Sequence, residues 1–403
     1  MKDGKYRVLL LCEHPVQYNT ILWSLQARHP KLDILVAYCS LRGAEGAVHH
    51  PDFGVDIKWD VPLLEGYPWA LVDGSAKSGK NGSARPGFFS KPLWRLIRDG
   101  RFDAIYVGGY YFPEAWFTLL AAKRLGIPYV LSTDVHSLES RRVRSAFSRA
   151  IKKAIVGRIF KMAGAVNTGS TGATAYVRSL GVPANRIILA RNVVDNGWWA
   201  ARAAEVDRAA VRGDWNIAAD ASVVLYCAKL QAWKRPADLL EAFAHANDEH
   251  SYLVYVGAGP LHKELEIRAS SLGISNRVRF LGFVNQSGLP AVYVASDLLV
   301  LPSEYEPFGL VVNEAMVCGC PAVVSDRVGA KYDLIREGET GYVFPCGDTA
   351  ALANLLSKLL ADRPRLARMG AAAKERMESW TPEMNVDSFA EAVELAVRRT
   401  SPG

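Results

Sequence analysis

The sequence predicts an α/β protein with two Rossmann-like domains, in each of which helices cover a mostly parallel sheet. The first observation is length, because 403 residues exceed what one hydrophobic core usually serves and suggest two domains of roughly 200 residues each. The second is a regular alternation of apolar, strand-like runs with helical patterns in the second half. The third is that the connections between these runs are short, as compact α/β units require.

The second half carries the clearer pattern. We expect a first strand at 222–228, where an apolar run precedes a helical pattern, and the same alternation then continues along the chain. The further strands are predicted at 252–256, 278–281, 298–302 and 321–325, and the helices at 236–246, up to about 272, near 289–295 and at 309–318.

The first half repeats this style less cleanly, with strands predicted at 7–12, 32–38, 104–107, 129–132 and 165–167. A segment rich in Gly, Ser and Lys at 73–87 cannot bury a core and should form a mobile loop of this domain. We place the domain boundary near residue 200, which gives an N-terminal domain at 1–199 and a C-terminal domain at 200–382. A final helix at 383–403 could cap either domain, including by packing back on the first.

Composition and targeting signals exclude several classes of protein. With 50% hydrophobic and 22% charged residues the chain has an ordinary globular balance, not that of a disordered or fibrous protein. We expect no secretory signal, because the first apolar run is short, and no stretch approaches the about 18 apolar residues of a membrane span. The six cysteines lack metal-ligand spacing, so we expect reduced thiols in a cytoplasmic protein and no metal site.

The net charge of +7 is spread unevenly, because the run 141–161 is rich in Lys and Arg and has no acidic residue. Apolar residues recur there every four positions, which predicts a helix with an apolar stripe and basic flanks. One interpretation is a helix packed on its own domain with a solvated basic face. The other is a patch that contacts anionic lipid headgroups or a phosphorylated acceptor. Nucleic-acid binding is not expected, since no RNA or DNA module accompanies the charge.

Two lysines and a glycine turn suggest a diphosphate site in the second half. Binding a diphosphate without a metal needs fixed cations, backbone amides and a helix N-terminus aimed at the phosphates. Lys229 directly follows the first strand of this half, and Lys234 lies in the same loop, although both could be ordinary surface lysines. After the next strand, Gly257 and Gly259 permit a close approach of the backbone to a ligand, or merely connect a strand to a helix.

The strongest local pattern is SEYEPFGLVVNEAMVCGCPAVVS, at 303–325. Glu306 lies in the loop after a buried strand, and Glu314 falls on the second turn of the following helix, within an otherwise apolar face. A carboxylate there would be costly without a partner, and a ribose diol is a plausible one because a carboxylate accepts two hydroxyl hydrogen bonds. The amides at the start of that helix favour phosphate oxygens, and they belong to Phe308, Gly309 and Leu310.

The spacing of Glu306 and Glu314 resembles the E-x7-E motif of retaining GT-B enzymes, and its setting is similar to glycosyltransferase family 4, the group 1 glycosyltransferases. CAKLQAWKRPADLLEAF, VGAGP, LGFV, GCPAVVSD and GETGYVF resemble the other motifs of that family in order and spacing. The resemblance covers about 190–382 well and the N-terminal half loosely. It implies the GT-B fold, in which two Rossmann-like domains face each other across a cleft.

The resemblance also implies roles for these residues. Lys229 and Lys234 would bind the diphosphate and neutralise the leaving group, Glu314 would hold the ribose, and Glu306 would contact hydroxyls of the transferred sugar. Position 229 is commonly Arg in the family. Here a point charge replaces a bidentate fork, and we expect function to survive that change.

Two further sites follow from the resemblance. Phe283 and Val284 would meet the base of the nucleotide through their backbone groups. His136, which lies just beyond the strand 129–132, resembles the family's histidine that faces the donor sugar, although a lone histidine is often a structural residue. Asp134 is a weaker candidate on the acceptor side and could instead cap the following helix.

The loop after the first strand departs from the family, where many members carry a glycine pair. It is polar instead and more suited to shaping an acceptor site, while a later glycine pair could supply the close backbone approach. The acceptor-side candidates are Glu13, His14, Gln17 and Tyr18 in the first loop, and Gly108 and Gly109 after a later strand.

We therefore expect a metal-independent, retaining glycosyltransferase that transfers a hexosyl or related sugar, from a UDP- or GDP-sugar in preference, to a glycan, lipid-linked or small-molecule hydroxyl. No obvious carboxylate nucleophile is present, so a front-face route is favoured, in which catalysis rests on positioning and on stabilising the departing diphosphate. No cofactor is expected. Such an enzyme would serve polysaccharide or glycoconjugate biosynthesis in the cytoplasm, or peripherally on the inner membrane face through 141–161.

Three alternatives remain open. An inverting GT-B enzyme or a sugar-nucleotide epimerase could use the same fold, and a non-catalytic nucleotide-sugar-binding protein could keep the same site. A dinucleotide dehydrogenase is disfavoured, because neither half shows a full GxGxxG turn followed by an acidic ribose anchor.

Overall fold

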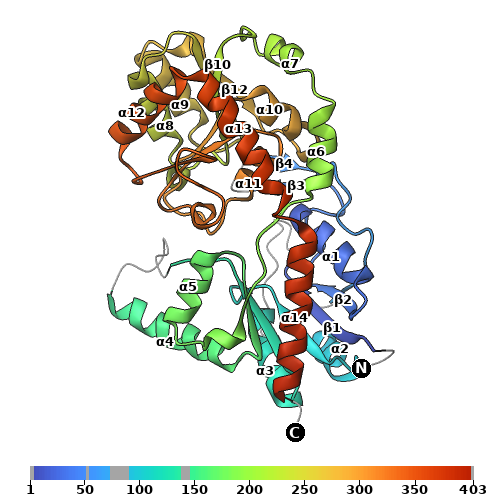
Figure 1. Cartoon of the computed structure of the whole chain (residues 1–403). Helices are drawn as coiled ribbons and strands as arrows, with labels where there is room; N and C mark the ends of the chain where they lie inside the picture. Colours follow the sequence, from blue (N-terminus) through green and yellow to red (C-terminus); the bar gives the residue numbers. More distant parts are fainter. Residues whose placement is uncertain (1–3, 51–53, 73–89, 138–145, 401–403) are drawn as a thin grey trace. The chain divides into compact units, whose positions relative to one another are not determined.

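A computed structural model describes residues 4–50, 54–72, 90–137 and 146–400 (Figure 1). The chain forms two compact units, which are described separately. The first contains residues 1–48, 57–193 and 382–403, and the second contains 49–56 and 194–381. The boundary between Val193 and Val194 precedes the one predicted near residue 200, because α6 (Asn196–Ala204) packs on helices of the second unit.

The first unit is built on a parallel sheet, which in the described part of the chain has seven strands in the order β5-β2-β1-β6-β7-β8-β9. The order reverses between β1 and β6, so the chain leaves the carboxyl ends of these neighbours in opposite directions, as in nucleotide-binding sheets. The strands are β1 Tyr6–Cys12, β2 Leu32–Tyr38, β5 Trp69–Leu71, β6 Ala104–Val107, β7 Tyr129–Thr133, β8 Ala165–Thr168 and β9 Ile187–Leu189.

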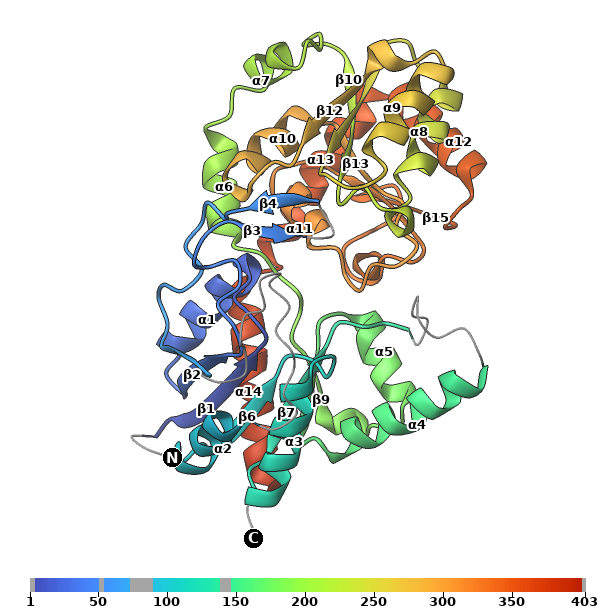
Figure 2. The same cartoon turned by 180° about the vertical axis from the view of Figure 1, so that it is seen from behind.

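Helices lie on both faces of this sheet. The C-terminal helix α14 begins at Pro382, which is pre-organised for a first helical position, and it runs along the sheet in the views of Figures 1 and 2. Its apolar residues Phe389, Val393 and Ala396 pack in one core with strands β1 and β7. The approach is close, because a Cβ at Gly164 would lie 2.8 Å from that of Ala396. The last helix therefore completes the core of the first unit.

The remaining helices of the first unit are shorter than α14 (Pro382–Thr400). They are α1 Gln17–Arg28, α2 Lys91–Asp99, α3 Pro113–Leu125, α4 Ala146–Met162 and α5 Thr171–Ser179, with a 3₁₀ turn at Ala184–Arg186. The strands β3 Val48–His50 and β4 Val55–Ile57 form a separate two-stranded sheet, most of which belongs to the second unit. The loop predicted at 73–87 lies outside the described residues, as do residues 141–145 of the basic run. Within the described chain, no helix is long and apolar enough to cross a membrane.

The second unit is a parallel sheet that, over the described residues, has six strands in the order β12-β11-β10-β13-β14-β15. β10, β13 and β14 are buried along their whole length, which explains why they read as continuous apolar runs in the sequence. β15, one of the two edge strands, lies beyond the predicted series. The strands are β10 Ser222–Cys227, β11 Ser251–Val256, β12 Val278–Gly282, β13 Leu298–Leu301, β14 Ala322–Ser325 and β15 Gly341–Phe344.

Several helices of this unit begin at a capping carboxylate. Asp195, Asp207, Asp348 and Asp362 each accept a hydrogen bond from a first-turn amide of the helix that follows. The helices are α6 Asn196–Ala204, α7 Arg208–Asp214, α8 Pro236–Ala246, α9 His262–Ser271, α10 Leu289–Ala295, α11 Leu310–Val317, α12 Thr349–Leu360 and α13 Arg363–Glu378, with 3₁₀ turns at Ala232–Lys234, Ser275–Arg277, Gln286–Gly288 and Gly329–Tyr332. The predicted α/β fold with two parallel sheets is confirmed.

Candidate functional site

The candidate site lies at the carboxyl edge of the sheet in the second unit. The order of strands reverses between β10 and β13, which pair directly, and the loops that follow these two strands carry Lys229 and Glu306. Open α/β sheets bind their ligands at such a reversal. Parallel strands therefore bring together residues that are far apart in the sequence. Lys234 and Glu306, which form a pair at this edge, are 72 positions apart.

Lys234 and Glu306 form an ion pair at this edge. The ammonium group of Lys234 donates to Oε2 of Glu306, and the two side chains are only 15% and 16% exposed. A backbone hydrogen bond of 2.8 Å from Glu304 to Trp233 joins their two loops. A partly buried lysine paired in this way is held in place, so the structure brings together two residues that the sequence predicts to bind a donor. Their roles toward a donor stay a prediction.

Lys229 has a fixed backbone at the end of β10. Its carbonyl oxygen accepts hydrogen bonds from the Tyr226 hydroxyl and the Gln231 amide, both at 2.9 Å. The Lys229 residue is half-buried at the same edge as Lys234. Its predicted role toward a diphosphate stays a prediction.

Gly257 and Gly259 make their close approach to the chain itself. Both have positive φ angles, 134° and 159°, and a Cβ would lie 2.0 Å from the oxygen of Ala228 and 2.4 Å from that of Leu230. The Gly257 amide also donates to Gly282 at 2.7 Å, which joins the ends of β11 and β12. These glycines therefore allow the loops after β10, β11 and β12 to pack closely together. The sequence alone did not distinguish this structural role from contact with a ligand.

Glu314 has a partner that the sequence analysis missed. The hydroxyl of Tyr293, in α10, donates to Oε2 of Glu314 at 2.7 Å. Although part of the Glu314 side chain is reached by solvent, dense packing around its carboxylate raises its pKa to about 7, and the Tyr293 hydrogen bond opposes this rise. Tyr293 was not recognised because PAVYVAS reads as an ordinary core helix.

The N-terminus of α11 lies one helical turn before Glu314 and next to Glu306. Gly309 precedes the helix with a φ of 99°, and a Cβ there would meet Leu301, Glu306 and Val328 at 3.1 to 3.3 Å. Phe308 is buried. A helix leaves its first amides without intrahelical acceptors, which is why the amides of Gly309 and Leu310 are predicted to bind an anion. This contact stays a prediction.

Phe283 and Val284 follow β12 and are half-buried at the same edge of the sheet. The chain turns after them through the 3₁₀ turn Gln286–Gly288, where a Cβ at Gly288 would come within 2.9 Å of the Val284 side chain. The predicted contact of their backbone with a base stays a prediction.

In the first unit, the predicted residues follow the carboxyl ends of β1, β6 and β7. His136 is half-buried and Asp134 exposed just beyond β7, where the Val135 amide donates to the Thr133 hydroxyl at 3.2 Å. Among the described residues, the next helix begins only at 146, so Asp134 is not seen to cap one. Asp134 instead lies close enough to Tyr18 to raise the pKa of that phenol, which desolvation already raises, to about 12.

The loop after β1 lies beside these groups. Glu13 and His14 approach to 3.9 Å, and desolvation lowers the pKa of His14 although the Glu13 charge raises it. Gln17 is the first residue of α1. Desolvation, together with the charges of Glu13, Tyr18 and Asp134, also raises the pKa of Tyr111. The loops of β1, β6 and β7 thus converge.

Gly108 and Gly109 end β6 in this group of loops. Gly109 has a φ of 127°, and a Cβ there would lie 2.9 Å from the ring of Tyr111, which is 73% exposed. The glycine thus lets an exposed aromatic ring fold back over the turn. No sequence motif had marked Tyr111.

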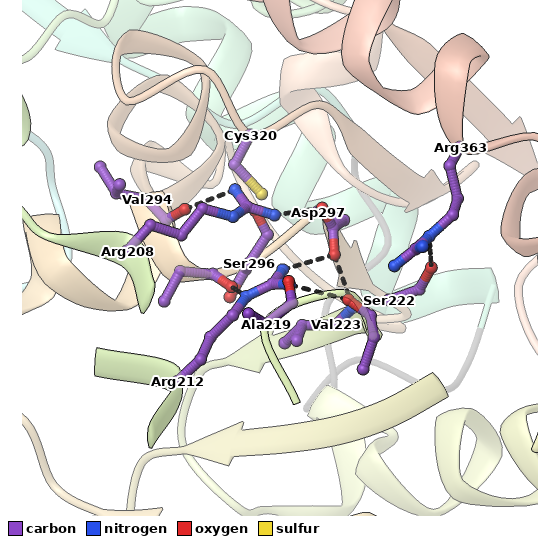
Figure 3. Close-up of polar contacts among 12 residues, drawn as sticks. Arg208, Arg212, Ala219, Ser222, Val223, Val294, Ser296, Asp297, Cys320 and Arg363 are labelled. Atoms are coloured by element: carbon purple, nitrogen blue, oxygen red, sulfur yellow. Dashed lines mark hydrogen bonds and ion pairs between the residues drawn. The ribbon is translucent and has the colours of Figure 1, made fainter. Parts of the chain in front are cut away.

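A second polar cluster lies at the amino edge of the second unit's sheet, away from the candidate site. Arg208 and Arg212, from α7, both point at Asp297, which directly precedes β13 (Figure 3). Arg212 is 2% exposed, and its guanidinium also donates to the carbonyl oxygens of Ala295, Ala219 and Ala221. Because these contacts tie α7 to the start of β13 and to the loop before β10, we interpret the cluster as a clamp for α7.

Among the described residues, no group of three or more His, Cys, Asp or Glu side chains is arranged to hold a metal ion.

Two family models match the chain, one for each half. The model described as "Glycosyl transferases group 1" matches residues 207–376, and the one described as "Glycosyl transferase 4-like domain" matches residues 25–192.

Among curated proteins, the chain is similar to a D-inositol 3-phosphate glycosyltransferase of Rhodococcus jostii (strain RHA1), with 37% identity over 230 residues, 55% of this chain and 50% of that protein. It is also 33% identical over 185 residues to an N-acetyl-alpha-D-glucosaminyl L-malate synthase of Bacillus anthracis, covering 45% and 48% of the two chains. The matched part spans about half the length of these relatives.

Solved structures match over almost the whole chain. Alr3699/HepE of Anabaena in complex with UDP superposes with a TM-score of 0.72 at 20% identity, covering 96% of this chain and 99% of the other. A glycosyltransferase of Rickettsia africae gives a TM-score of 0.74 at 14% identity, with 99% and 100% covered. At such identities the likeness shows the fold.

Proposed function

Because the chain belongs to the group 1 glycosyltransferases and has the GT-B fold, we propose that it transfers a sugar from a nucleotide diphosphate sugar to an acceptor hydroxyl with retention of configuration. One observation carries the proposal. The paired Lys234 and Glu306 and the N-terminus of α11 lie at one edge of the second unit's sheet, with Glu314 one turn further along that helix. A cation, helix amides and a carboxylate are the groups that a diphosphate and a ribose require.

In the proposed reaction, the sugar leaves its diphosphate as the acceptor hydroxyl attacks the same face of the anomeric carbon. The acceptor proton passes to an oxygen of the departing phosphate, so that no protein nucleophile is needed. Lys234 and Lys229 stabilise the negative charge that develops on the diphosphate, and the first amides of α11 add to this effect. Glu306 accepts hydrogen bonds from hydroxyls of the transferred sugar.

For the donor we propose a UDP- or GDP-sugar bound without a metal. Support comes from structural neighbours, since the Anabaena protein was crystallised with UDP and with UDP-glucose. The base would contact the backbone of Phe283 and Val284, and Glu314 would hold the ribose. Lysines and helix amides carry the charge compensation that a divalent cation supplies in other enzymes.

Release of a nucleoside diphosphate tests this proposal. The protein is incubated with UDP-, GDP-, ADP- and TDP-sugars in EDTA, and release of the diphosphate from one of them, with or without added acceptor sugars, is expected. Full loss of activity in EDTA would contradict the metal-free site, and no release from any donor under either condition would contradict the function.

We also propose that α4 places the protein at the inner, cytoplasmic face of a membrane, next to a lipid-linked acceptor. On this helix, the side chains of Val156 and Phe160 are buried in the first unit, while Ile155 and Met162 are 50% and 45% exposed. Lys153, Arg158 and Lys161 are exposed around them. Exposed apolar side chains among basic ones suit an anionic lipid surface, where each cation contributes about 1 kcal/mol.

Sedimentation with vesicles measures this contact. We expect binding to phosphatidylglycerol vesicles that weakens with salt, and weak binding to phosphatidylcholine vesicles. Ile155→Ser should weaken binding about fivefold, since burial of the exposed half of an isoleucine contributes about 1 kcal/mol. Ile267→Ser, a change at a 71% exposed position of the second unit, serves as the control. Equal effects of both substitutions would contradict the role of α4.

A further inference from the structure

Tyr293 makes a directed contact with the carboxylate that the proposed function assigns to the ribose. Its phenol is fully buried in α10, and the hydroxyl donates to Oε2 of Glu314 at 2.7 Å. An ionised carboxylate has about four acceptor positions. With one of them taken by Tyr293, Oε1 and the rest of Oε2 remain for two hydroxyls of a ligand.

The ring of Tyr293 is fixed on its other sides. The indole of Trp199, 1% exposed in α6, packs on it with ring centroids 5.8 Å apart. The thiol sulfur of Cys227, at the end of β10, lies 3.6 Å from the hydroxyl. Three elements of the second unit therefore enclose the phenol, and its hydroxyl cannot leave Glu314 without repacking them.

We propose that Tyr293 is a positioning residue of the donor site, whose hydroxyl holds the Glu314 carboxylate in one orientation so that it can accept both ribose hydroxyls. The inference rests on the proposed function and extends it to a residue that does not contact the donor. It requires that only the carboxylate form of Glu314 binds well, because the neutral acid has a hydroxyl of its own to place and one acceptor fewer.

The surroundings of Glu314 make this hydrogen bond decisive. Desolvation raises the pKa of Glu314 to about 7, and the Tyr293 hydrogen bond is the contact that lowers it. The titratable groups that face it from β10 and α11 are the Cys227 and Cys318 thiols, whose pKa values burial raises to about 12, so both are neutral near pH 7. Lys374, in α13, acts on Cys318. Removing the hydroxyl therefore moves the pKa of Glu314 upward, and at pH 7 the neutral acid prevails.

The experiment measures donor affinity against pH for the wild type and for Tyr293→Phe. A nucleotide sugar, UDP-glucose or GDP-glucose, is titrated by calorimetry between about pH 5.5 and 8.5, where its diphosphate stays fully ionised, unlike the terminal phosphate of free UDP. In the wild type, affinity should fall as the pH drops through about 7. In Tyr293→Phe the midpoint should move up by about one pH unit, which weakens binding about fivefold at pH 7 and approaches about tenfold at lower pH. Turnover at saturating donor should change little.

Two further variants separate positioning from structural damage. Tyr255→Phe removes another fully buried hydroxyl of the same unit, one that donates to the Pro236 carbonyl oxygen at 2.8 Å, and should leave the midpoint unchanged. Glu314→Gln should bind weakly with no midpoint near pH 7, and adding Tyr293→Phe to it should change the pH profile no further.

The outcomes distinguish the two levels of the argument. An unmoved midpoint in Tyr293→Phe, or the same movement in Tyr255→Phe, overturns the role of Tyr293. Lower thermal stability of Tyr293→Phe alone does not support it, because a purely structural residue would show that too. Failure of the wild type to bind any nucleotide sugar at any pH overturns the proposed function instead.

Discussion

Replacing Lys234 by alanine should lower kcat by at least about 100-fold, the usual loss when one donor to a developing oxyanion is removed. The ammonium lies at the carboxyl edge of the sheet, 15% exposed and paired with Glu306. Its removal withdraws a cation from the departing diphosphate and leaves the Glu306 carboxylate uncompensated beside it, so both effects oppose charge build-up on the leaving group. Donor turnover at saturation measures the loss.

Two comparisons sharpen this result. Lys234→Arg keeps the charge and should recover part of the activity, although a planar guanidinium does not reproduce the ammonium geometry. Lys358→Ala removes an exposed lysine from α12 of the same unit and should leave kcat unchanged. A folded Lys234→Ala variant with nearly normal kcat would show that this lysine does not serve the leaving group.

Asp297→Ala should destabilise the second unit by about 3 kcal/mol, the lower end for breaking a buried ion pair, since the Asp297 side chain is 22% exposed. The substitution leaves Arg212, 2% exposed, without its charge partner, and it removes the acceptor of the Val223 amide, which donates to Asp297 at 2.7 Å. Denaturant unfolding, fitted with a separate transition for each unit, measures the loss.

An exposed carboxylate provides the control for this change. Asp220 stands in the loop before β10 and is exposed, so Asp220→Ala should shift stability by no more than about 0.5 kcal/mol. Similar small shifts for both variants would contradict the clamp interpretation. Because the cluster lies at the amino edge of the sheet, the remaining folded Asp297→Ala protein should bind donor with unchanged affinity.

Much of the second unit was predictable because of how parallel strands are covered. β10, β13 and β14 are buried on both faces, so each appears as an unbroken apolar run that stands out from the helical patterns between them. The two edge strands, β12 and β15, are only partly buried; β12 was predicted, whereas β15 was absent from the predicted series of strands. The fold class therefore followed from the buried strands, whereas one of the two edges of the sheet did not.

The partners of the site residues could not be predicted in the same way. Glu306 and Glu314 stand out because carboxylates are rare in apolar runs, but Tyr293 and Lys234 meet them only through the packing of separate loops and helices. Gly257 and Gly259 are likewise required by tertiary contacts, because a Cβ at either position would clash with the loop after β10. Sequence pattern indicates which residues are unusual, and the fold decides what they touch.

The position of the last helix also depends on tertiary contacts. Its apolar stripe could have covered either sheet in the sequence analysis. It packs on the first unit, where Gly164 leaves room for Ala396 and a larger residue would not. The clamp of Arg208, Arg212 and Asp297 was missed because each residue alone reads as solvated surface.

The most direct test of the central claim is the anomeric configuration of the transfer product. The protein is incubated with its donor nucleotide sugar and an acceptor in EDTA, and proton NMR follows the anomeric signal before hydrolysis or mutarotation can alter it. We predict that the new glycosidic bond has the same configuration as the bond in the donor. A product with the opposite configuration would contradict retention and the front-face reaction in which Lys234 and Glu306 are proposed to take part.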